Sequence, residues 1–307
     1  MYSSEMRICS LLPGATEILY ALGLGEAIVG VTHECDYPPD AQYKPIVVRS
    51  NIDHKQMSSG EIDRQVGLIL QGGNNLYAID EPAFRESAPD LIVTQGLCDV
   101  CALDFNEVSR LANLLPSKPE ILSLSPTSLA DVLNDILRVG AATQRLLVAQ
   151  ALVRELQKRI DDVAAQTPAR RPRVICLEWF EPLYVAGHWV PEMVQQAGGN
   201  DVLAKAGTPS KKVEWQEVID ARPEIILLIP CGFDVRRAIK EATPLRALPG
   251  WNDLPAVKLN RVFALNGSAY FSRPGPRLVN GLEILAQLIH PGETAQMLSP
   301  VDATTLN

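Results

Sequence analysis

Cysteine and histidine side chains stand in loop-like segments of this sequence, where thiolate and imidazole groups can bind metal. Cys98 and Cys101 form a Cys-x-x-Cys pair after one apolar run, and His33 and Cys35 follow another. A structural zinc site usually has four ligands, and the sequence contains no second Cys-x-x-Cys pair. A metal site of Cys98, Cys101, Cys35 and His33 therefore requires the two loops to converge. Loop packing and redox chemistry are the alternative roles of the pair.

Aromatic residues cluster in two further loop-like segments, Trp179-Phe180 and Tyr270-Phe271. Aromatic faces suit a large, flat, apolar ligand, whereas core packing is the alternative role. His188 follows a glycine and precedes a helical pattern. A neutral imidazole at that position can ligate a metal, although a loop histidine more often makes an ordinary hydrogen bond.

Catalytic motifs are missing from the sequence. It contains no Gly-x-Ser-x-Gly, no phosphate-binding loop, no Gly-x-Gly-x-x-Gly after a strand and no His-Glu-x-x-His. Loop carboxylates are weak evidence for an acid–base pair, because they are usually solvated. Those near the predicted site are Glu34, Asp36, Glu178 and Glu181. The sequence therefore predicts a binding protein and not an enzyme.

The elements that must position these residues alternate between strand and helix, which predicts an α/β fold with parallel sheets. Ligands of such sheets bind beyond the carboxyl ends of the strands, which is where the residues above stand. Predicted strands are 7–11, 28–32, 91–94, 120–124, 173–177, 225–229 and 262–265, and predicted helices are 16–22, 61–70, 81–87, 106–114, 190–197, 215–220 and 276–289. The phrases Ala88-Pro89-Asp90 and Arg222-Pro223-Glu224 each precede an apolar strand and suggest a weak internal repeat.

One long amphipathic stretch, Thr127–Gln166, separates the two halves. Its apolar residues recur at helical spacing, which predicts a single helix joining two lobes with a ligand cleft between them. Two shorter helices that meet near Gly140 are the alternative. The predicted organisation is a lobe over 1–126, a connecting helix over 127–167 and a lobe over 168–307.

Composition narrows the class of protein. The chain of 307 residues has 47% hydrophobic residues and a net charge of −8, with no basic stripe, so nucleic acid is not an expected partner. No apolar run is long enough to span a membrane. The first residues contain no basic segment followed by a long apolar one, so the chain as written is expected in the cytoplasm.

Five motifs in order resemble one family over about residues 7–291. They are Ser10–Glu17, Val31–Pro38, Pro89–Val93, Ala186–Met193 with Ala197-Gly198-Gly199, and Tyr270–Arg277. The chain resembles the helical-backbone substrate-binding proteins of ABC importers for iron-siderophore, haem and cobalamin, and most of all the cobalamin-binding branch. The resemblance implies two Rossmann-like lobes joined by one long helix, and a periplasmic or cell-envelope location.

The resemblance also implies a ligand wall from each lobe. The positions that match are Pro13, Gly14, Glu34, Asp36, Tyr37, Ser50 and Gln95 in the first lobe, and Trp179, Phe180, Gly187, His188, Ser210, Ser268, Ala269, Tyr270 and Phe271 in the second. Close relatives carry aromatic residues where Glu34, Gln95 and approximately Ser50 stand here. Glu81 and Glu217 are the nearest matches to the acidic residues that dock on a permease.

We therefore expect a monomeric binding protein that needs no cofactor and captures a corrinoid such as cobalamin, for ABC-type uptake or intracellular salvage. Its implied partners are an ABC permease and ATPase. One alternative is a metal, ferric-chelate or haem binding protein that uses the loop cysteines and histidine. Another is an enzyme that processes a corrinoid.

Overall fold

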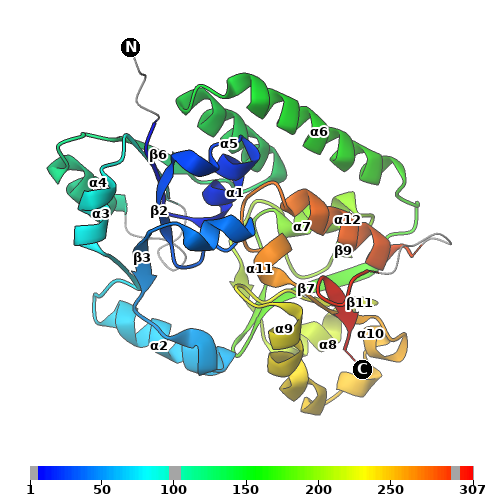
Figure 1. The fold of residues 1–307 in the computed structure, drawn as a ribbon. Helices are drawn as coiled ribbons and strands as arrows, with labels where there is room; N and C mark the ends of the chain where they lie inside the picture. The colour runs from blue at the N-terminus through cyan, green and yellow to red at the C-terminus, as the bar shows by residue number, and fades with distance from the viewer. Residues whose placement is uncertain (1–5, 97–104, 292–297, 307) are drawn as a thin grey trace. The chain divides into compact units, whose positions relative to one another are not determined.

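The computed structural model describes residues 6–96, 105–291 and 298–306. The chain packs as two compact units. Unit 1 comprises Met1–Met57, Arg64–Pro126 and Asp131–Arg154, and unit 2 comprises Ser58–Asp63, Thr127–Ala130 and Glu155–Asn307. Each unit contains a sheet of mostly parallel strands with helices around it (Figure 1), which confirms the predicted α/β class.

Unit 1 is built on a sheet that has six strands within the described residues, in the order β4-β3-β2-β1-β5-β6. Only the β3–β4 pair is antiparallel. The strands are β1 (Ile8–Ser10), β2 (Ile28–Thr32), β3 (Ile46–Ser50), β4 (Tyr77–Ile79), β5 (Leu91–Gln95) and β6 (Glu120–Leu124). Strands β3 and β4 were not predicted, although the run Ile46-Val47-Val48 carries the β-branched signal of β3.

The helices of unit 1 include α1 (Pro13–Ala21), α2 (Ser59–Gln71, whose first residues group with unit 2), α3 (Glu81–Ser87) and α4 (Phe105–Leu114), with short 3₁₀ turns η1 (Gly25–Ala27), η2 (Pro39–Tyr43) and η3 (His54–Gln56). Phe84 of α3 and Leu111 of α4 share one apolar cluster with Cys9, Val47 and Ile92 of the sheet. Burial of this cluster fixes one face of the sheet and leaves the carboxyl ends of its strands to the loops.

Unit 2 contains a sheet of seven strands within the described residues, in the order β10-β8-β7-β11-β12-β13, with β9 paired to β7. The strands are β7 (Arg173–Phe180), β8 (Leu183–Val185), β9 (Asn200–Asp201), β10 (Lys211–Lys212), β11 (Ile225–Leu228), β12 (Val262–Leu265) and β13 (Ala303–Thr305). The four residues of β11 are all buried, as expected for a parallel strand covered on both faces.

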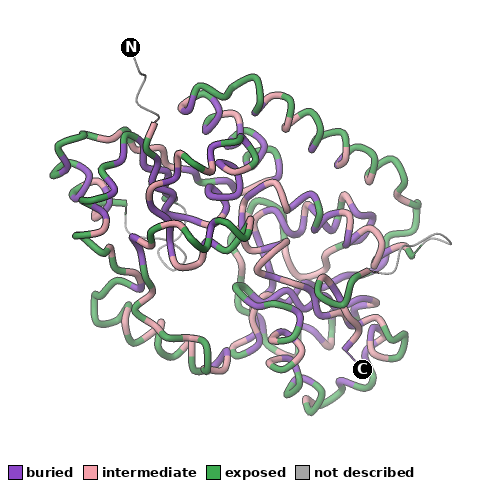
Figure 2. The backbone as a smooth tube through the Cα atoms, in the orientation of Figure 1, coloured by how far each residue is buried: buried purple, intermediate pink, exposed green. Residues whose placement is uncertain are grey.

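The helices of unit 2 are α7 (Val190–Gln196), α8 (Trp215–Ala221), α9 (Val235–Ala242), α10 (Pro255–Lys258), α11 (Gly267–Tyr270) and α12 (Leu278–Ile289), with 3₁₀ turns η4 (Thr243–Ala247) and η5 (Trp251–Asp253) among the described residues. Val218 of α8 and Ala238 of α9 pack in one apolar cluster with Ile226 and Leu228 of β11. Figure 2 shows the strands of both units mostly in purple and long stretches of α2 and α6 in green.

The internal repeat has a structural basis, because both units contain the same clamp at the start of a central strand. The guanidinium of Arg7 donates to the Ser87 carbonyl at 2.7 Å, and the Arg7 amide donates to Asp90 Oδ2 at 2.9 Å. In unit 2, the guanidinium of Arg173 donates to the Ala221 carbonyl at 2.6 Å, and its amide donates to Glu224 Oε2 at 3.0 Å.

The clamp also fixes the end of each preceding helix. The C-cap residues Ala88 and Arg222 are left-handed, with φ of 37° and 44°. Each helix therefore ends on a carbonyl that accepts a hydrogen bond from an arginine at the start of a central strand, and the acidic residue accepts the backbone amide of that same arginine.

The single continuous helix predicted over 127–166 is wrong, and the two-helix alternative is correct. Helix α5 covers Leu129–Ala142 and helix α6 covers Leu146–Ala165. Gln144 is left-handed with φ of 58°. The Arg145 amide donates to the Gly140 carbonyl at 2.7 Å and the Gln144 amide donates to the Ala141 carbonyl at 3.3 Å. These two bonds form a Schellman motif, which ends a helix and turns the chain.

Gly140 explains how α6 packs against the end of α5. A Cβ atom on Gly140 would lie 2.4 Å from the Cβ of Ala149, which is fully buried on α6. The two helices therefore meet through small residues. No helix in the described part of the chain is long and apolar enough to cross a membrane.

Candidate functional site

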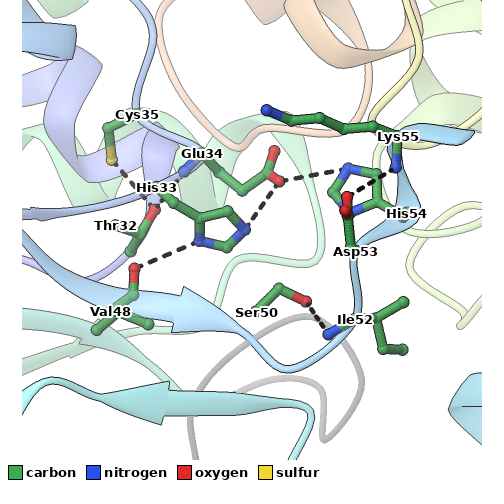
Figure 3. Close-up of polar contacts among 10 residues, drawn as sticks. All are labelled: Thr32, His33, Glu34, Cys35, Val48, Ser50, Ile52, Asp53, His54 and Lys55. Atoms are coloured by element: carbon green, nitrogen blue, oxygen red, sulfur yellow. Dashed lines mark hydrogen bonds and ion pairs between the residues drawn. The ribbon is translucent and has the colours of Figure 1, made fainter.

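The loop after β2 contains two predicted residues that lie side by side, His33 and Glu34. Strands β2 and β3 are parallel neighbours, with Val31 paired to Ile46 and Thr32 paired to Val48. Because the register aligns their carboxyl ends, His33-Glu34 after β2 and the turn η3 after β3 come together (Figure 3). Glu34 is flanked by two imidazoles: its Oε1 lies 3.2 Å from His33 Nε2 and 3.8 Å from His54 Nε2.

His33 is held from both sides. Its Nδ1 lies 3.3 Å from the Val48 carbonyl oxygen, while its Nε2 is buried and has no hydrogen-bond partner of good geometry within the described residues. The side chains are partly covered, with exposed fractions of 20% for His33, 34% for Glu34 and 31% for His54. The cluster is therefore accessible to a ligand and still shielded enough for its charges to matter.

Cys35 points away from this cluster. Its Sγ lies 3.1 Å from Thr16 Oγ1 and 3.4 Å from Thr32 Oγ1, and the residue is 4% exposed. A cavity of about 280 Å³ opens beside the loop. It is lined by Val31, Thr32, His33, Cys35, Asp36, Ala41, Gln42 and Ile46. The thiol is therefore a packed, hydrogen-bonded group at the wall of this cavity.

The other predicted residues of unit 1 lie at the same edge of its sheet. Pro13 and Gly14 form the first turn of α1, and Gly14 is buried. Ser50 ends β3 and accepts a hydrogen bond from the Ile52 amide at 3.0 Å. Gln95 ends β5 and is 8% exposed. Tyr37, in contrast, is 44% exposed. The accessible predicted side chains of unit 1 are therefore in the β2 loop.

In unit 2, the predicted loop 178–182 is partly strand. Strand β7 extends to Phe180 and returns as β8, with Trp179 paired to Tyr184. Phe180 is 6% exposed and belongs to the apolar cluster of unit 2. Its role in a ligand wall stays a prediction.

Trp179 stands at the edge of this core, next to a stacked pair. Its ring centroid lies 5.3 Å from that of Phe233, and the Arg237 guanidinium carbon lies 3.9 Å from the Phe233 ring centroid. Burial lowers the pKa of Arg237. Phe233 and Arg237 were not predicted as site residues. The Cys231-Gly232-Phe233 loop after β11 was noted in the sequence, but only the fold places α9 beside it.

His188 occupies a strained turn that the surrounding backbone holds. Its φ is 52°, in the left-handed region. Its amide donates to the Thr208 carbonyl at 2.6 Å, and its carbonyl accepts from the Gly207 amide at 2.9 Å. The neighbouring Gly187 amide donates to Ser210 Oγ at 3.1 Å, and a Cβ on Gly187 would lie 2.3 Å from the Thr208 oxygen. The turn therefore requires glycine at 187 and fixes His188 beside Ser210.

The imidazole of His188 is neutral. Burial lowers its pKa from the ordinary value of 6.5. Its Nδ1 is buried and has no hydrogen-bond partner among the described residues, and its ring centroid lies 5.7 Å from that of Trp189. Non-glycine residues in the left-handed region carry strain that often marks a functional position.

The loop after β12 lies next to the His188 turn. The Trp189 indole donates to the Phe271 carbonyl at 2.8 Å. Ser268 and Ala269 lie in α11, and the Tyr270 hydroxyl donates to Asp302 Oδ1 at 2.6 Å. Phe271 is 3% exposed, and its role in a ligand wall stays a prediction. Two of the sequence motifs, 186–193 and 270–277, thus form one surface of unit 2.

The predicted metal set of Cys98, Cys101, Cys35 and His33 stays a prediction, because Cys98 and Cys101 lie outside the described residues. Within the described part of the chain, no group of three or more His, Cys, Asp or Glu side chains could hold a metal ion. Cys35 is turned toward two threonines, as described above. His54 was missed because it falls in a polar stretch whose preceding strand, β3, was not recognised.

Glu81 is the first residue of α3, and Glu217 is the third residue of α8. Their side chains are 47% and 46% exposed. Glu81 lies 3.6 Å from Arg85 Nη2, and Glu217 accepts the Glu214 amide at 2.8 Å in a capping box. Both carboxylates therefore already stabilise a helix start, and permease docking by them stays a prediction.

Known proteins resemble the chain over almost its full length. The vitamin B12-binding protein of Vibrio cholerae serotype O1 is 26% identical over 281 residues, which cover 90% of this chain and 86% of that protein. The uncharacterized ABC transporter substrate-binding lipoprotein YvrC of Bacillus subtilis is 25% identical over 292 residues, covering 93% of this chain and 80% of that protein.

A solved structure shares the fold. The periplasmic heme-binding protein RhuT from Roseiflexus sp. RS-1, in apo form, superposes with a TM-score of 0.70 at 23% identity, covering 93% of this chain and 98% of that one. In addition, a family model described as periplasmic binding protein matches residues 86–269, more than half of the chain. The two sheets of mostly parallel strands agree with that match. The chain belongs to the periplasmic binding protein family.

Proposed function

We propose that the protein is a substrate-binding protein that captures a corrinoid, such as cobalamin, with loops that include the His188 turn of unit 2. His188 is the observation that carries the proposal. A neutral imidazole whose Nδ1 lacks a hydrogen-bond partner, held on a strained turn beside Trp189, is suited to a metal-centred ligand. The similarity of 90% of the chain to a vitamin B12-binding protein supports a corrinoid as that ligand.

The remaining groups of the proposed site provide apolar platforms and polar partners. Tyr37 and Trp179 supply aromatic surface, and Glu34, Ser210 and Ser268 supply polar groups for amide side arms. As proposed here, the protein delivers its ligand to an ABC permease and ATPase at the cell envelope. The similarity to an ABC transporter substrate-binding lipoprotein supports this partner.

Ligand titration of the full chain tests the proposal. Cyanocobalamin, aquocobinamide, haem and a ferric siderophore are added separately, and binding is followed by visible absorbance. We expect saturable one-to-one binding of a corrinoid. With aquocobinamide, whose cobalt can accept an imidazole, we expect a spectral shift that His188→Asn removes. Asn is the matched replacement because it tolerates the left-handed conformation.

A second pair of variants tests the aromatic contribution. Tyr37→Ala should weaken corrinoid binding by about tenfold, since a contacting aromatic side chain contributes about 1.4 kcal/mol. Tyr43→Ala, in the same segment and 87% exposed, should leave the affinity unchanged. Stoichiometric binding of haem or siderophore with no binding of either corrinoid would refute the corrinoid assignment. Conversion of the corrinoid to a product would show that the protein is an enzyme and not only a binding protein.

A further inference from the structure

The C-terminal segment 298–306 braces the loop after β12. Its strand β13 pairs antiparallel with β12, and Leu306 is buried in the apolar cluster of unit 2. The Asn266 amide donates to the Asp302 carbonyl at 3.0 Å, one residue before β13 begins. Asn266 in turn caps the start of α11 with its side chain. The C-terminal segment therefore holds the point where β12 ends and α11 begins.

Asp302 also holds a side chain of α11, through the hydroxyl of Tyr270. This hydroxyl donates to Asp302 Oδ1 at 2.6 Å, the short distance of a hydrogen bond to a carboxylate. A second contact of the ring is weaker: the Arg277 guanidinium carbon lies 6.0 Å from the ring centroid, at the outer limit of a cation–π interaction. Of these two contacts, the bond to Asp302 is the stronger one.

The backbone at Tyr270 is fixed separately, by other elements of unit 2. A Cβ atom on Gly281 of α12 would lie 2.4 Å from the Tyr270 carbonyl oxygen, so α12 and this backbone are in close contact. The carbonyl of the next residue, Phe271, accepts the Trp189 indole at 2.8 Å. Because the backbone is already held, the hydroxyl bond decides where the ring points. Tyr270 is only partly buried, so part of its surface is accessible to a ligand.

We propose that Asp302 is a positioning residue for ligand binding: it orients Tyr270, which the sequence placed in the ligand wall, toward the bound corrinoid. This inference rests on the proposed function. The hydroxyl bond restricts the side-chain torsions of Tyr270 before the ligand arrives, and a group that is already ordered costs less entropy to bring into contact. The C-terminal segment is therefore part of the binding machinery, acting through Tyr270.

Titration of full-chain variants with aquocobinamide, followed by visible absorbance, tests this role. Asp302→Ala and Tyr270→Phe should each weaken binding about fivefold, because each removes one partner of the same hydrogen bond. The double variant Tyr270→Phe/Asp302→Ala should bind no more weakly than either single variant, since both changes break one interaction. Asp302→Asn keeps an acceptor oxygen for the hydroxyl and should recover most of the affinity that Asp302→Ala loses.

Two further measurements separate positioning from a general structural role. Val301→Ala, in the same segment and 69% exposed, should leave the affinity unchanged. In the ligand-free chain, isotope-labelled at the tyrosine Cζ atom, nuclear magnetic resonance identifies Tyr270 as the signal that Tyr270→Phe removes. This signal should shift in Asp302→Ala and stay near its wild-type position in Asp302→Asn. Circular dichroism checks that each variant is folded.

Three outcomes would overturn the inference while the wild-type chain still binds aquocobinamide. They are an unchanged affinity of Asp302→Ala, losses of the two single variants that add in the double variant, and a Tyr270 signal that does not move in Asp302→Ala. Absence of corrinoid binding by the wild-type chain would instead refute the proposed function, and this inference would fall with it.

Discussion

At the scale of the residue, His188 combines backbone strain with a half-buried side chain whose pKa is lowered by burial. Its amide and carbonyl are bound to the 207–208 segment, so the strain is held by neighbouring backbone. The imidazole gains nothing from this arrangement in the isolated protein, because its Nδ1 has no partner within the described residues. A ligand that accepts a hydrogen bond from this nitrogen, or a ligand metal that this nitrogen coordinates, would therefore supply the interaction that Nδ1 lacks in the isolated protein.

His188 also predicts a pH dependence of stability. Burial lowers the folded-state pKa below 6.5, so the unfolded chain takes up a proton first as the pH falls. Above about pH 6.5 the ring is neutral in both states, and below it the free energy of unfolding decreases. Urea unfolding at about pH 7.5 and about pH 5.5 measures this decrease. His188→Asn should show a smaller decrease than wild type, and an equal decrease would contradict the buried neutral ring.

Glu34 follows β2 at the carboxyl edge of its sheet, where the sequence pattern placed it, whereas His188 and Ser210 flank the end of β8, which runs antiparallel to β7. Their part in a ligand site stays a prediction. Phe180 and Phe271 are buried. Their burial was not predicted, because an aromatic residue after an apolar run is equally compatible with a loop and with a core position. His54 was missed because its role depends on the pairing of β2 with β3, which is a contact and not a local pattern.

At the scale of the element, the break between α5 and α6 shows where periodicity misleads. Apolar residues keep helical spacing through the turn, because both helices bury a face. The Schellman motif at Gln144 leaves little mark on that pattern. Gly140 was the only signal, and its purpose is a close approach to Ala149 rather than the turn itself. The other predicted helices and strands are present in the described residues, whereas α9, α10, α11, β3, β4, β8, β9, β10 and β13 were not predicted.

Two glycine variants separate packing from helix propensity. Gly140→Ala places a Cβ atom 2.4 Å from the Ala149 Cβ and should lower the free energy of unfolding by about 1–3 kcal/mol. Gly67→Ala, within α2, meets no atom within 4 Å and should raise it by about 0.5–1 kcal/mol. Chemical denaturation measures both. If Gly140→Ala were as stable as Gly67→Ala, the helices would not touch at this position.

At the scale of the whole molecule, the two units repeat one construction. Arg7 with Asp90 and Arg173 with Glu224 tie a central strand to the helix before the next strand. Hydrogen bonds from a charged group to a helix-end carbonyl contribute about 1.5–3 kcal/mol when buried, and less when partly exposed as here. The repeated motifs Ala88-Pro89-Asp90 and Arg222-Pro223-Glu224 indicated this shared arrangement, because a proline and an acidic residue at fixed spacing have a local structural cause.

Truncation of either arginine should affect its own unit. Arg173→Ala should lower the free energy of unfolding by about 1 kcal/mol and speed amide hydrogen exchange at the end of α8 and the start of β7. Arg7→Ala should do the same at α3 and β1. Exchange followed by mass spectrometry locates the change. Faster exchange spread evenly over both units after either substitution would show that the clamps are not local.

The clamp has a consequence for comparing this chain with its relatives. If the acidic residue is lost, the backbone amide of the arginine loses its acceptor. If the arginine is lost, the carbonyl at the end of the helix loses its donor. The acid accepts a backbone amide that any residue except proline supplies, so the arginine and the acid act on different groups. Relatives that keep the clamp should therefore keep both an arginine at position 7 or 173 and an acid at position 90 or 224, which gives two anchors for aligning distant members whose overall identity is low.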